Sequence, residues 1–219
     1  MLRAVATVVF ALCVGACANQ SPAPLSAASL GKLQGKSVLA TQYEKPDFVA
    51  LNMSNAVFGM LGGAMMIAEG NQIVRENQVP DPAQDISSAL QSRLTAAQGT
   101  RPMPVSKKTS DQAISAAAVV AANPGSDYVL DVKTVDWMMN YYPGDTTHYR
   151  VTYAAKMRLI DAATNSVVAE AGCKTVQGDD KNPPTRAQLL EGKAALLKSY
   201  LSKAAATCSD LLARDALKL

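Results

Sequence analysis

The sequence predicts a mixed α/β (α+β) fold. We expect one mixed sheet with a parallel strand–helix–strand unit, an antiparallel hairpin and a long C-terminal helix packed on one face. Three observations predict it: a period of two over 148–160, a capped helical pattern over 81–99, and an apolar stripe through the C-terminal segment. The chain has 219 residues, 48% of them apolar, which is enough to bury a core as a single domain.

The first half of the chain supplies a short strand candidate at 37–41 and a well-bounded helix. Asp81 is a favourable N-cap, Pro82 suits the first helical turn, and Gly99 ends the helix. Its apolar positions recur on one face: Ile86, Leu90, Leu94 and Ala97. A strand at 102–106, an alanine-rich helix at 110–122 and a strand at 127–138 follow. We expect these last three elements to form the parallel unit.

The second half shows the clearest strand pattern, over 148–160. Its apolar side chains alternate with polar ones, which predicts an antiparallel strand with one face toward water: Tyr149, Val151, Tyr153, Ala155, Met157 and Leu159. A turn at 161–166 leads into a returning strand at 167–175. Thr185 and Gln188 have the spacing of a capping box, which predicts the start of a helix that continues to the C-terminus.

The N-terminus has the pattern of a secretory signal. Arg3 precedes an uncharged apolar run over 4–16, which as a helix of about 20 Å is too short for a bilayer core of about 30 Å. The run ends in Val14-Gly15-Ala16-Cys17, which resembles the lipobox of bacterial lipoproteins. The alternative is an ordinary secretory signal that contains a cysteine.

The lipobox resemblance implies that Cys17 carries a diacylglycerol on its thiol and that residues 1–16 are removed. Ala18, rather than an aspartate, follows the cysteine. By the same resemblance this favours a lipid-anchored position at the outer membrane, facing the periplasm. Residues 17–36 then form the lipidated N-terminus and a flexible tether, and 37–219 form a single globular periplasmic domain.

Residues 100–215 resemble the periplasmic domains of the TolB N-terminal, CsgG and LpoB group. The resemblance lies in the strand DYVL at 127–130, the hairpin turn LIDAATN at 159–165 and the helix behind them. It implies a protein that scaffolds, secretes or activates other envelope proteins. None of that group's partner-binding residues can be carried over to this chain.

An uncharged segment, AVFGMLGGAMMIA, occupies 56–68. Gly59 and Gly63 form a G-x-x-x-G pattern, which allows helices to approach closely. Three interpretations stay open. Its length favours a buried core segment first, a subunit interface second and membrane insertion third.

An aromatic-rich group follows at the end of the strand 127–138. Trp137, Tyr141 and Tyr142 could form a partner-binding patch, because Trp and Tyr are frequent at binding hot spots. They could equally close one end of the core.

Charge and motifs exclude several function classes. The formal net charge of +3 is too balanced for a nucleic-acid binder, and a single histidine, His148, excludes a multi-histidine zinc site. Alternation places Asp127 and Asp131 on one face and Asp136 on the other, with basic residues nearby as cross-strand partners. The sequence contains no phosphate-binding loop, nucleophile motif or zinc spacing. We expect no catalytic residue, no metal and no cofactor.

The remaining cysteines predict a disulfide. After cleavage and lipidation, only Cys173 and Cys208 are left, and the periplasm is oxidising. Cys173 lies on the apolar face of its strand and Cys208 on the apolar stripe of the last helix. Two separate buried thiols are the alternative.

These patterns lead to one functional prediction and two alternatives. We expect a non-catalytic lipoprotein that acts by protein–protein interaction in cell-envelope assembly or maintenance, with an unidentified envelope protein as partner. The first alternative is a subunit of an oligomeric outer-membrane export channel, a homo-oligomer that the G-x-x-x-G segment would serve. The second is a periplasmic binder of lipid or a small ligand.

Overall fold

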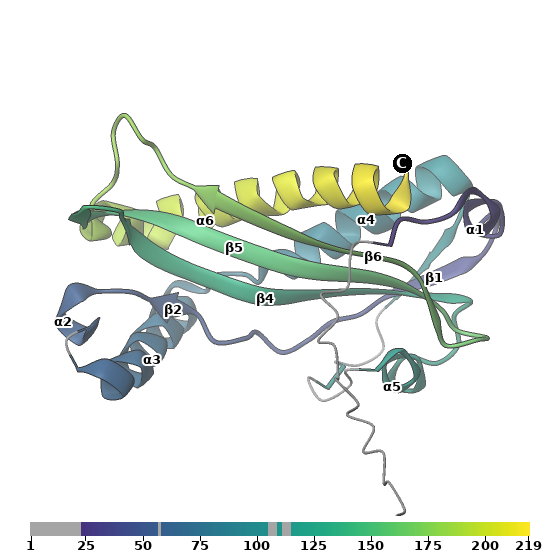
Figure 1. The fold of residues 1–219 in the computed structure, drawn as a ribbon, viewed down its shortest axis with the longest axis horizontal. Coiled ribbons are helices and arrows are strands. Elements are labelled where there is room, and N and C mark those ends of the chain that lie inside the picture. The colour runs from purple at the N-terminus through teal and green to yellow at the C-terminus, as the bar shows by residue number, and fades with distance from the viewer. Residues whose placement is uncertain (1–22, 57, 105–108, 111–114) are drawn as a thin grey trace, which may run out of the picture.

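The fold is a single mixed sheet with helices packed against it, as the sequence predicts (Figure 1). The computed structural model describes residues 23–56, 58–104, 109–110 and 115–219. In chain order the elements are α1 (Ala27–Gly31), β1 (Ser37–Ala40), β2 (Val49–Ala50), α2 (Met53–Ala56), α3 (Gly59–Asn77), α4 (Pro82–Gln98), β3 (Arg101–Met103), α5 (Ala116–Ala122), β4 (Tyr128–Tyr142), β5 (Asp145–Asp161), β6 (Ser166–Gln177), α6 (Arg186–Leu212) and a terminal π-helix η1 (Ala213–Leu217).

The sheet has the strand order β3-β1-β4-β5-β6, and β2 pairs with the other half of β4. β1 runs parallel to both β3 and β4, whereas β4, β5 and β6 form an antiparallel meander. Helices α4 and α6 lie along one face of the sheet, and α5 lies on the other (Figure 1). α3 lies beside β2, at the opposite end of the sheet from α5.

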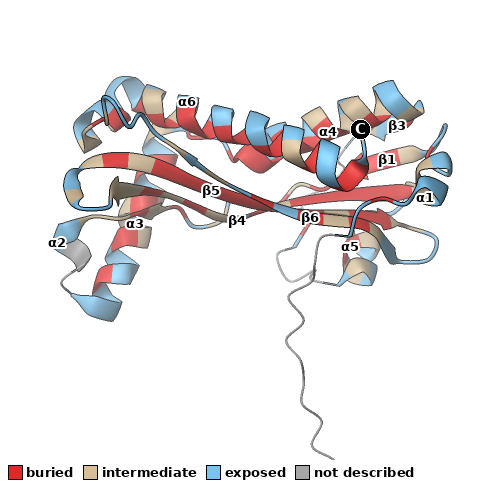
Figure 2. Ribbon diagram, turned by 45° about the horizontal axis from the view of Figure 1, so that its top comes forward, coloured by how far each residue is buried: buried red, intermediate tan, exposed pale blue. Residues whose placement is uncertain are grey.

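The core forms between the sheet and the helices α4 and α6. All six alternating residues of 148–160 that the sequence assigns to one face of β5 are buried (Figure 2). The opposite face is not wholly solvated, because Ile160 packs with Val119 of α5 and Val129 of β4 in a small second cluster. The predicted wet face is therefore covered at this end.

Local signals fix the ends of the two long helices that cover the sheet. Asp81 caps α4 by accepting the backbone N–H of Ala83 at 3.0 Å, and Gly99 ends it with a φ of +62°. Thr185 and Gln188 form the predicted capping box at the start of α6. The backbone is non-helical over Glu191–Ala194, so α6 consists of two helical segments.

Three predicted boundaries differ from the structure. The strand expected at 127–138 is β4, which continues to Tyr142. The strand expected at 102–106 is β3, which ends at Met103. The helix expected from Ser110 begins at Ala116 in the described residues, where the side chain of Ser115 caps it. Residues 111–114 lie outside the described part of the chain.

The prediction of a flexible tether is wrong for residues 23–36, which belong to the folded domain. Ala23 exchanges two backbone hydrogen bonds with Glu170 of β6, at 2.9 and 2.8 Å. Leu25 and Leu33 are buried in the main core. The three leucines of this stretch, Leu25, Leu30 and Leu33, are too few and too unevenly spaced to form an apolar period. Their packing against the core depends on tertiary contacts that the local pattern does not reveal.

Candidate functional site

Cys17, the predicted lipid attachment residue, lies outside the described residues. Ala23, six positions later, is hydrogen-bonded to β6. Six residues span at most about 20 Å when fully extended. A lipid on Cys17 would therefore hold the folded domain close to the bilayer, whatever the conformation of the intervening chain.

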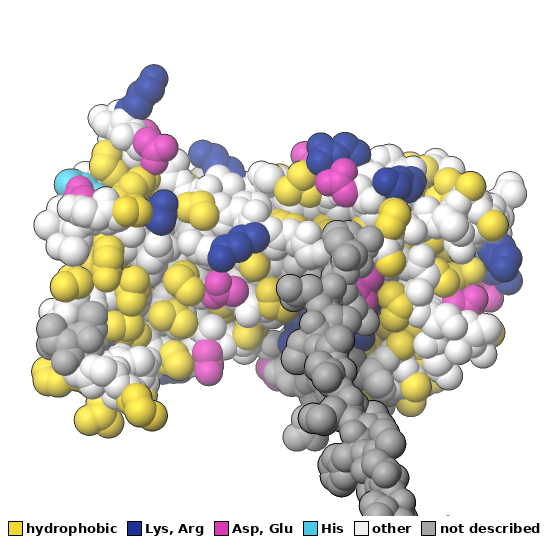
Figure 3. Space-filling model, in the orientation of Figure 1, with side chains coloured by type: hydrophobic (Ala, Val, Ile, Leu, Met, Phe, Trp, Pro, Cys, Tyr) yellow, Lys and Arg dark blue, Asp and Glu magenta, His cyan; other side chains and the backbone are white. Residues whose placement is uncertain are grey.

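The largest exposed apolar side chains gather where α2 and α3 meet. We call this surface the apolar tip, and Figure 3 shows hydrophobic side chains at that end of the molecule. Its members and their exposed fractions are Met53 (45%), Phe58 (58%), Met60 (96%), Leu61 (75%) and Met65 (48%). The preferred interpretation of 56–68 as a buried core segment is thus wrong for most of its described side chains. No described helix combines the length and apolarity needed to cross a membrane.

The C-terminal part of α3 holds the tip in place. Gly62, Met66, Gly70 and Ile73 recur on one face and are buried. A Cβ at Gly70 would lie 1.9 Å from the carbonyl oxygen of Phe48, so only glycine permits this approach. The first turns of α3 extend beyond these contacts and carry the tip.

Phe48 joins the base of α3 to the sheet. Its backbone N–H donates to the side chain of Asn71 at 3.0 Å, and its ring meets Trp137 edge-on with centroids 5.1 Å apart. The base of the tip is therefore anchored in the core.

The predicted glycine pair does not provide a close approach within the described chain. A Cβ at Gly59 or Gly63 would meet no described atom within 4 Å. Gly59 has a φ of +56°, which glycine adopts readily. Gly70 makes the close contact instead, and the sequence analysis missed it. Its neighbours Glu69 and Asn71 are polar, which hides the apolar stripe to which it belongs.

The tip lies in the longest uncharged stretch of the described chain. Residues 48–68 contain no Asp, Glu, Lys, Arg or His. At the base of the tip, Glu69 forms an ion pair with Arg186 of α6 and accepts a hydrogen bond from Asn52 at 2.5 Å. The charges therefore begin only where α3 meets the body of the domain.

Trp137 is a core residue, which confirms the alternative that the sequence left open for it, and it does not form a partner-binding patch. Its side chain is 1% exposed, and its indole N–H donates to the carbonyl oxygens of Pro46 and Asp47 at 3.2 and 3.0 Å. Tyr141 and Tyr142 are half-buried at the end of β4, where the Arg150 guanidinium lies 5.6 Å from the Tyr142 ring centroid. Tyr141 and Tyr142 therefore do not form a shared surface patch with Trp137.

A β-bulge between Thr134 and Asp136 explains the position of the tryptophan. One extra residue, Val135, shifts the alternation, so Trp137 pairs with Tyr153 on the core face. The same shift puts Asp136 opposite Ala154, on the face that carries Asp131. The predicted placement of Asp136 on the other face is therefore wrong.

The carboxylates of the sheet make structural contacts. Asp131 pairs with Arg158 at 2.6 Å and accepts the hydroxyls of Tyr43 and Thr41 at 2.6 and 3.1 Å. Burial and the charge of Asp131 raise the pKa of the Tyr43 hydroxyl.

Two further acidic groups lie nearer to solvent. The backbone N–H and hydroxyl of Ser37 donate to Asp127 at 2.8 and 2.7 Å, which lowers the pKa of this carboxyl to about 2. His148 pairs with Asp145 at 2.6 Å. Within the described ranges, no group of three acidic, histidine or cysteine side chains could hold a metal ion.

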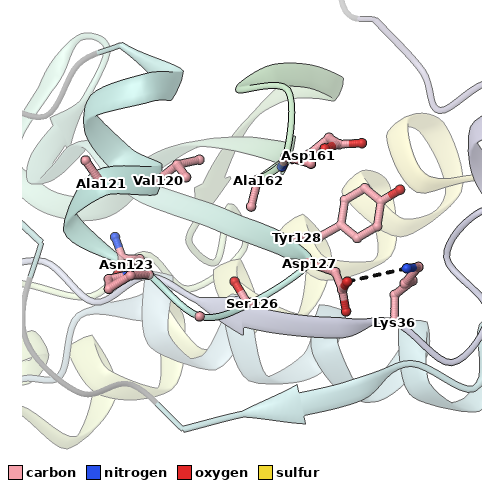
Figure 4. Close-up of a pocket in the computed structure, with 12 residues that line it drawn as sticks. Lys36, Val120, Ala121, Asn123, Ser126, Asp127, Tyr128, Asp161 and Ala162 are labelled. Carbon is pink, nitrogen blue, oxygen red and sulfur yellow. Dashed lines mark hydrogen bonds and ion pairs between the residues drawn. The ribbon is translucent and has the colours of Figure 1, made fainter.

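A cavity of about 470 Å³ lies where α5, the start of β4 and the β5–β6 turn meet. Figure 4 shows Asp127 directed toward Lys36 on one side and Val120 and Ala121 of α5 on the other. The Oγ of Ser126 is buried and finds no hydrogen-bond partner among the described residues. The lining is mixed and includes two carboxylates. Asp127 is held by Ser37 and Lys36, and Asp161 accepts the backbone N–H groups of Ala163 and Thr164.

Cys173 and Cys208 form the predicted disulfide. Their Cα atoms are 5.5 Å apart, within the usual range for such a bond. The bond joins β6 to α6, so neither sulfur is available as a nucleophile or a metal ligand.

No protein family model and no curated protein matches the chain. Several solved structures resemble its fold weakly, among them the following three. The PelC dodecamer from Paraburkholderia phytofirmans is 13% identical, with 78% of this chain and 84% of that chain covered and a TM-score of 0.33.

The other two structures are similarly remote. The hypothetical protein CT253 from Chlamydia trachomatis is 11% identical, with coverages of 82% and 95% and a TM-score of 0.37. Uncharacterized lipoprotein B from Nitrosomonas europaea is 16% identical, with coverages of 84% and 92% and a TM-score of 0.35. Because the TM-scores are low, these likenesses carry no argument about function.

Proposed function

We propose that this chain is a non-catalytic, lipid-anchored protein of the bacterial envelope that acts by binding other envelope proteins. It would be held at the outer membrane, facing the periplasm. The observation that carries the proposal is the lipobox-like run ending at Cys17, only six residues before the strand pairing of Ala23. A domain attached so closely works within a short distance of the membrane surface.

The polar contacts support a non-catalytic role. Asp131 is buried with Arg158, Tyr43 and Thr41, and Lys156 pairs with Glu170 at 2.6 Å. These pairs cross neighbouring strands, and an ion pair between neighbouring strands stabilises the sheet. We therefore assign them to the stability of the sheet.

The edge of the sheet supports protein binding. β6 is the last strand in the sheet order, and Ala23 pairs with it at Glu170. Lys174 and Val176 are exposed beyond that pair, and the side chain of Val176 is 49% exposed. An extended edge of this kind can hydrogen-bond a strand of a partner protein.

The anchor is tested on the protein isolated from cells that express the full chain. Mass spectrometry of its N-terminal peptide should find a diacylglyceryl group on Cys17 and no residues 1–16. The Cys17→Ser variant should carry no lipid. An unmodified Cys17 in the mature protein, or a retained N-terminal segment, would overturn the anchor.

The partner surface is tested by crosslinking in intact envelopes. A photo-crosslinking residue in place of Lys174 should capture a protein, whereas the same residue in place of Ala206 on the exposed side of α6 should not. Equal capture at both positions, or none at Lys174, would exclude the β6 edge as the binding surface.

A second candidate function is a subunit of an oligomeric export channel. The exposure of the apolar tip favours it, because an apolar surface of this kind often lies at a subunit contact. Light scattering on the chain from residue 18 onward, which lacks the apolar signal and Cys17, distinguishes the two. A ring-sized oligomer would support the channel, and a monomer would support the binding role.

A further inference from the structure

We propose that the apolar tip enters the surface of the bilayer that carries the lipid anchor, as a second and independent membrane contact. The tip then contacts the boundary between the lipid headgroups and the acyl chains. The nearness of this bilayer rests on the proposed lipid on Cys17, but the tip itself lies elsewhere in the fold and is tested separately.

The chemistry of the tip fits hydrocarbon. Met60 and Leu61 are 96% and 75% exposed, and Phe58 is 58% exposed. A headgroup phosphate or an acidic peptide would need cationic partners, yet residues 48–68 provide no charge of either sign. Apolar side chains without charges lose nothing electrostatically when they leave water.

The geometry of α3 fits a shallow insertion. At 3.6 residues per turn, Met60, Leu61 and Met65 fall within an arc of about 140°. The buried residues Gly62 and Met66 lie on the opposite side of the helix and hold it to the domain. Because no described helix is suited to crossing a membrane, the tip would lie in the interface rather than span it.

The anchor can bring the bilayer to the tip. Ala23 pairs with Glu170, which lies in register with Arg158 and Asp131 across the sheet. The base of the tip lies at β2, which pairs with Met138. Seven residues of strand separate Asp131 from Met138, or about 23 Å. Four strand spacings of about 4.8 Å also separate Ala23 from β2 across the sheet, so the two points lie about 30 Å apart. Because a bilayer is an extended surface, the anchor and the tip can contact it at separate points.

A second copy of the chain is a less suitable partner for the tip than a lipid surface. Stable protein interfaces use roughly 20–30 residues on each side, whereas the tip offers five large side chains. A fluid lipid surface adapts to a small projecting contact, and the anchor already supplies the rest of the affinity.

The test uses the mature lipidated chain with Met60→Cys. This cysteine is the single free thiol, because Cys17 carries lipid and Cys173 is bonded to Cys208. It is labelled with an environment-sensitive fluorophore and reconstituted into phosphatidylethanolamine–phosphatidylglycerol vesicles. The emission should shift to shorter wavelength, and nitroxide-bearing lipids should quench it several-fold. The same label on Ala206→Cys should remain unquenched, because Ala206 is exposed to solvent on α6 and is not part of the tip.

Three outcomes separate the possibilities. An unquenched label at position 60 on vesicle-bound protein overturns the tip contact and leaves the anchor intact. Failure of the lipidated chain to bind vesicles overturns the anchor. A wavelength shift without vesicles that grows with protein concentration assigns the tip to a second copy and overturns the lipid occupant. As a control for the tip, adding Leu61→Ser to the labelled, lipidated chain should reduce the quenching at position 60 several-fold.

Discussion

At the residue scale, Asp131 connects three elements of the sheet region. Its carboxylate is 5% exposed and bonds Arg158 of β5, Tyr43 and Thr41. A buried ion pair adds little stability compared with apolar side chains of the same volume, but removing one partner leaves the other desolvated and unpaired. Asp131 is therefore a residue where a small chemical change should have a large effect.

We expect Asp131→Asn to lower the free energy of unfolding by about 3 kcal/mol. The value lies at the low end for buried pairs because Arg158 retains 15% exposure. Urea unfolding followed by circular dichroism measures it as a lower midpoint at unchanged slope. Asp215→Asn, which changes the exposed pair with Arg214, is the matched control and should leave the midpoint unchanged. Equal shifts in the two variants would contradict the role of Asp131.

The lowered pKa of Asp127 predicts that the stability of the folded state depends on pH. The hydrogen bonds from Ser37 lower its pKa from 3.8 to about 2 in the folded protein. The folded state therefore prefers the ionised carboxylate, and the resulting stability is present above pH 3.8 and lost as the pH falls through about 2. Unfolding midpoints measured between pH 5 and 2 should fall less steeply for Asp127→Asn than for the unchanged chain. Parallel curves would contradict the assigned bonds.

At the element scale, α3 differs along its length. Its C-terminal part depends on Gly70 against the Phe48 backbone, whereas Gly63 near the tip has free space around it. Two glycines of one helix thus have opposite roles, and substitution by alanine separates them.

Gly70→Ala should destabilise the domain by about 3 kcal/mol, because the new methyl group meets backbone that cannot move aside without shifting α3. Gly63→Ala should stabilise it by up to about 1 kcal/mol, since alanine is the better helix former. Thermal and urea unfolding of both variants measure the difference. Similar effects at the two positions would mean that α3 does not pack on Phe48 as described.

Elements with signals close together in the sequence could be predicted. Asp81, Pro82 and Gly99 mark the ends of α4, and the alternation over 148–160 identifies the core face of β5. Hydrophobicity alone could not tell whether the segment 56–68 is covered, because covering depends on elements distant in sequence. Alternation likewise failed at Trp137, because it assumes that β4 has no bulge.

At the scale of the whole molecule, the helical layer and the sheet must stay together. α6 packs on β5 and β6, and the disulfide joins its second half to β6. The pairing could be predicted from the sequence because the apolar face of the strand and the stripe of the helix both contain one cysteine. The burial of Leu25 and Leu33 in the main core could not be predicted from the sequence.

The disulfide between Cys173 and Cys208 should stabilise the domain. The bond closes a loop with a sequence separation of 35 residues, which restricts the unfolded chain and is worth about 3–4 kcal/mol in the chain-entropy description. We expect a reducing agent to lower the urea midpoint of the chain from residue 18 onward, which contains neither Cys13 nor Cys17. The double variant Cys173→Ala, Cys208→Ala should start at the lower midpoint and not respond to the reducing agent. Thiol titration of the denatured, unreduced protein checks the bond directly. It should find no free thiol, and two reactive thiols per chain would refute the pairing.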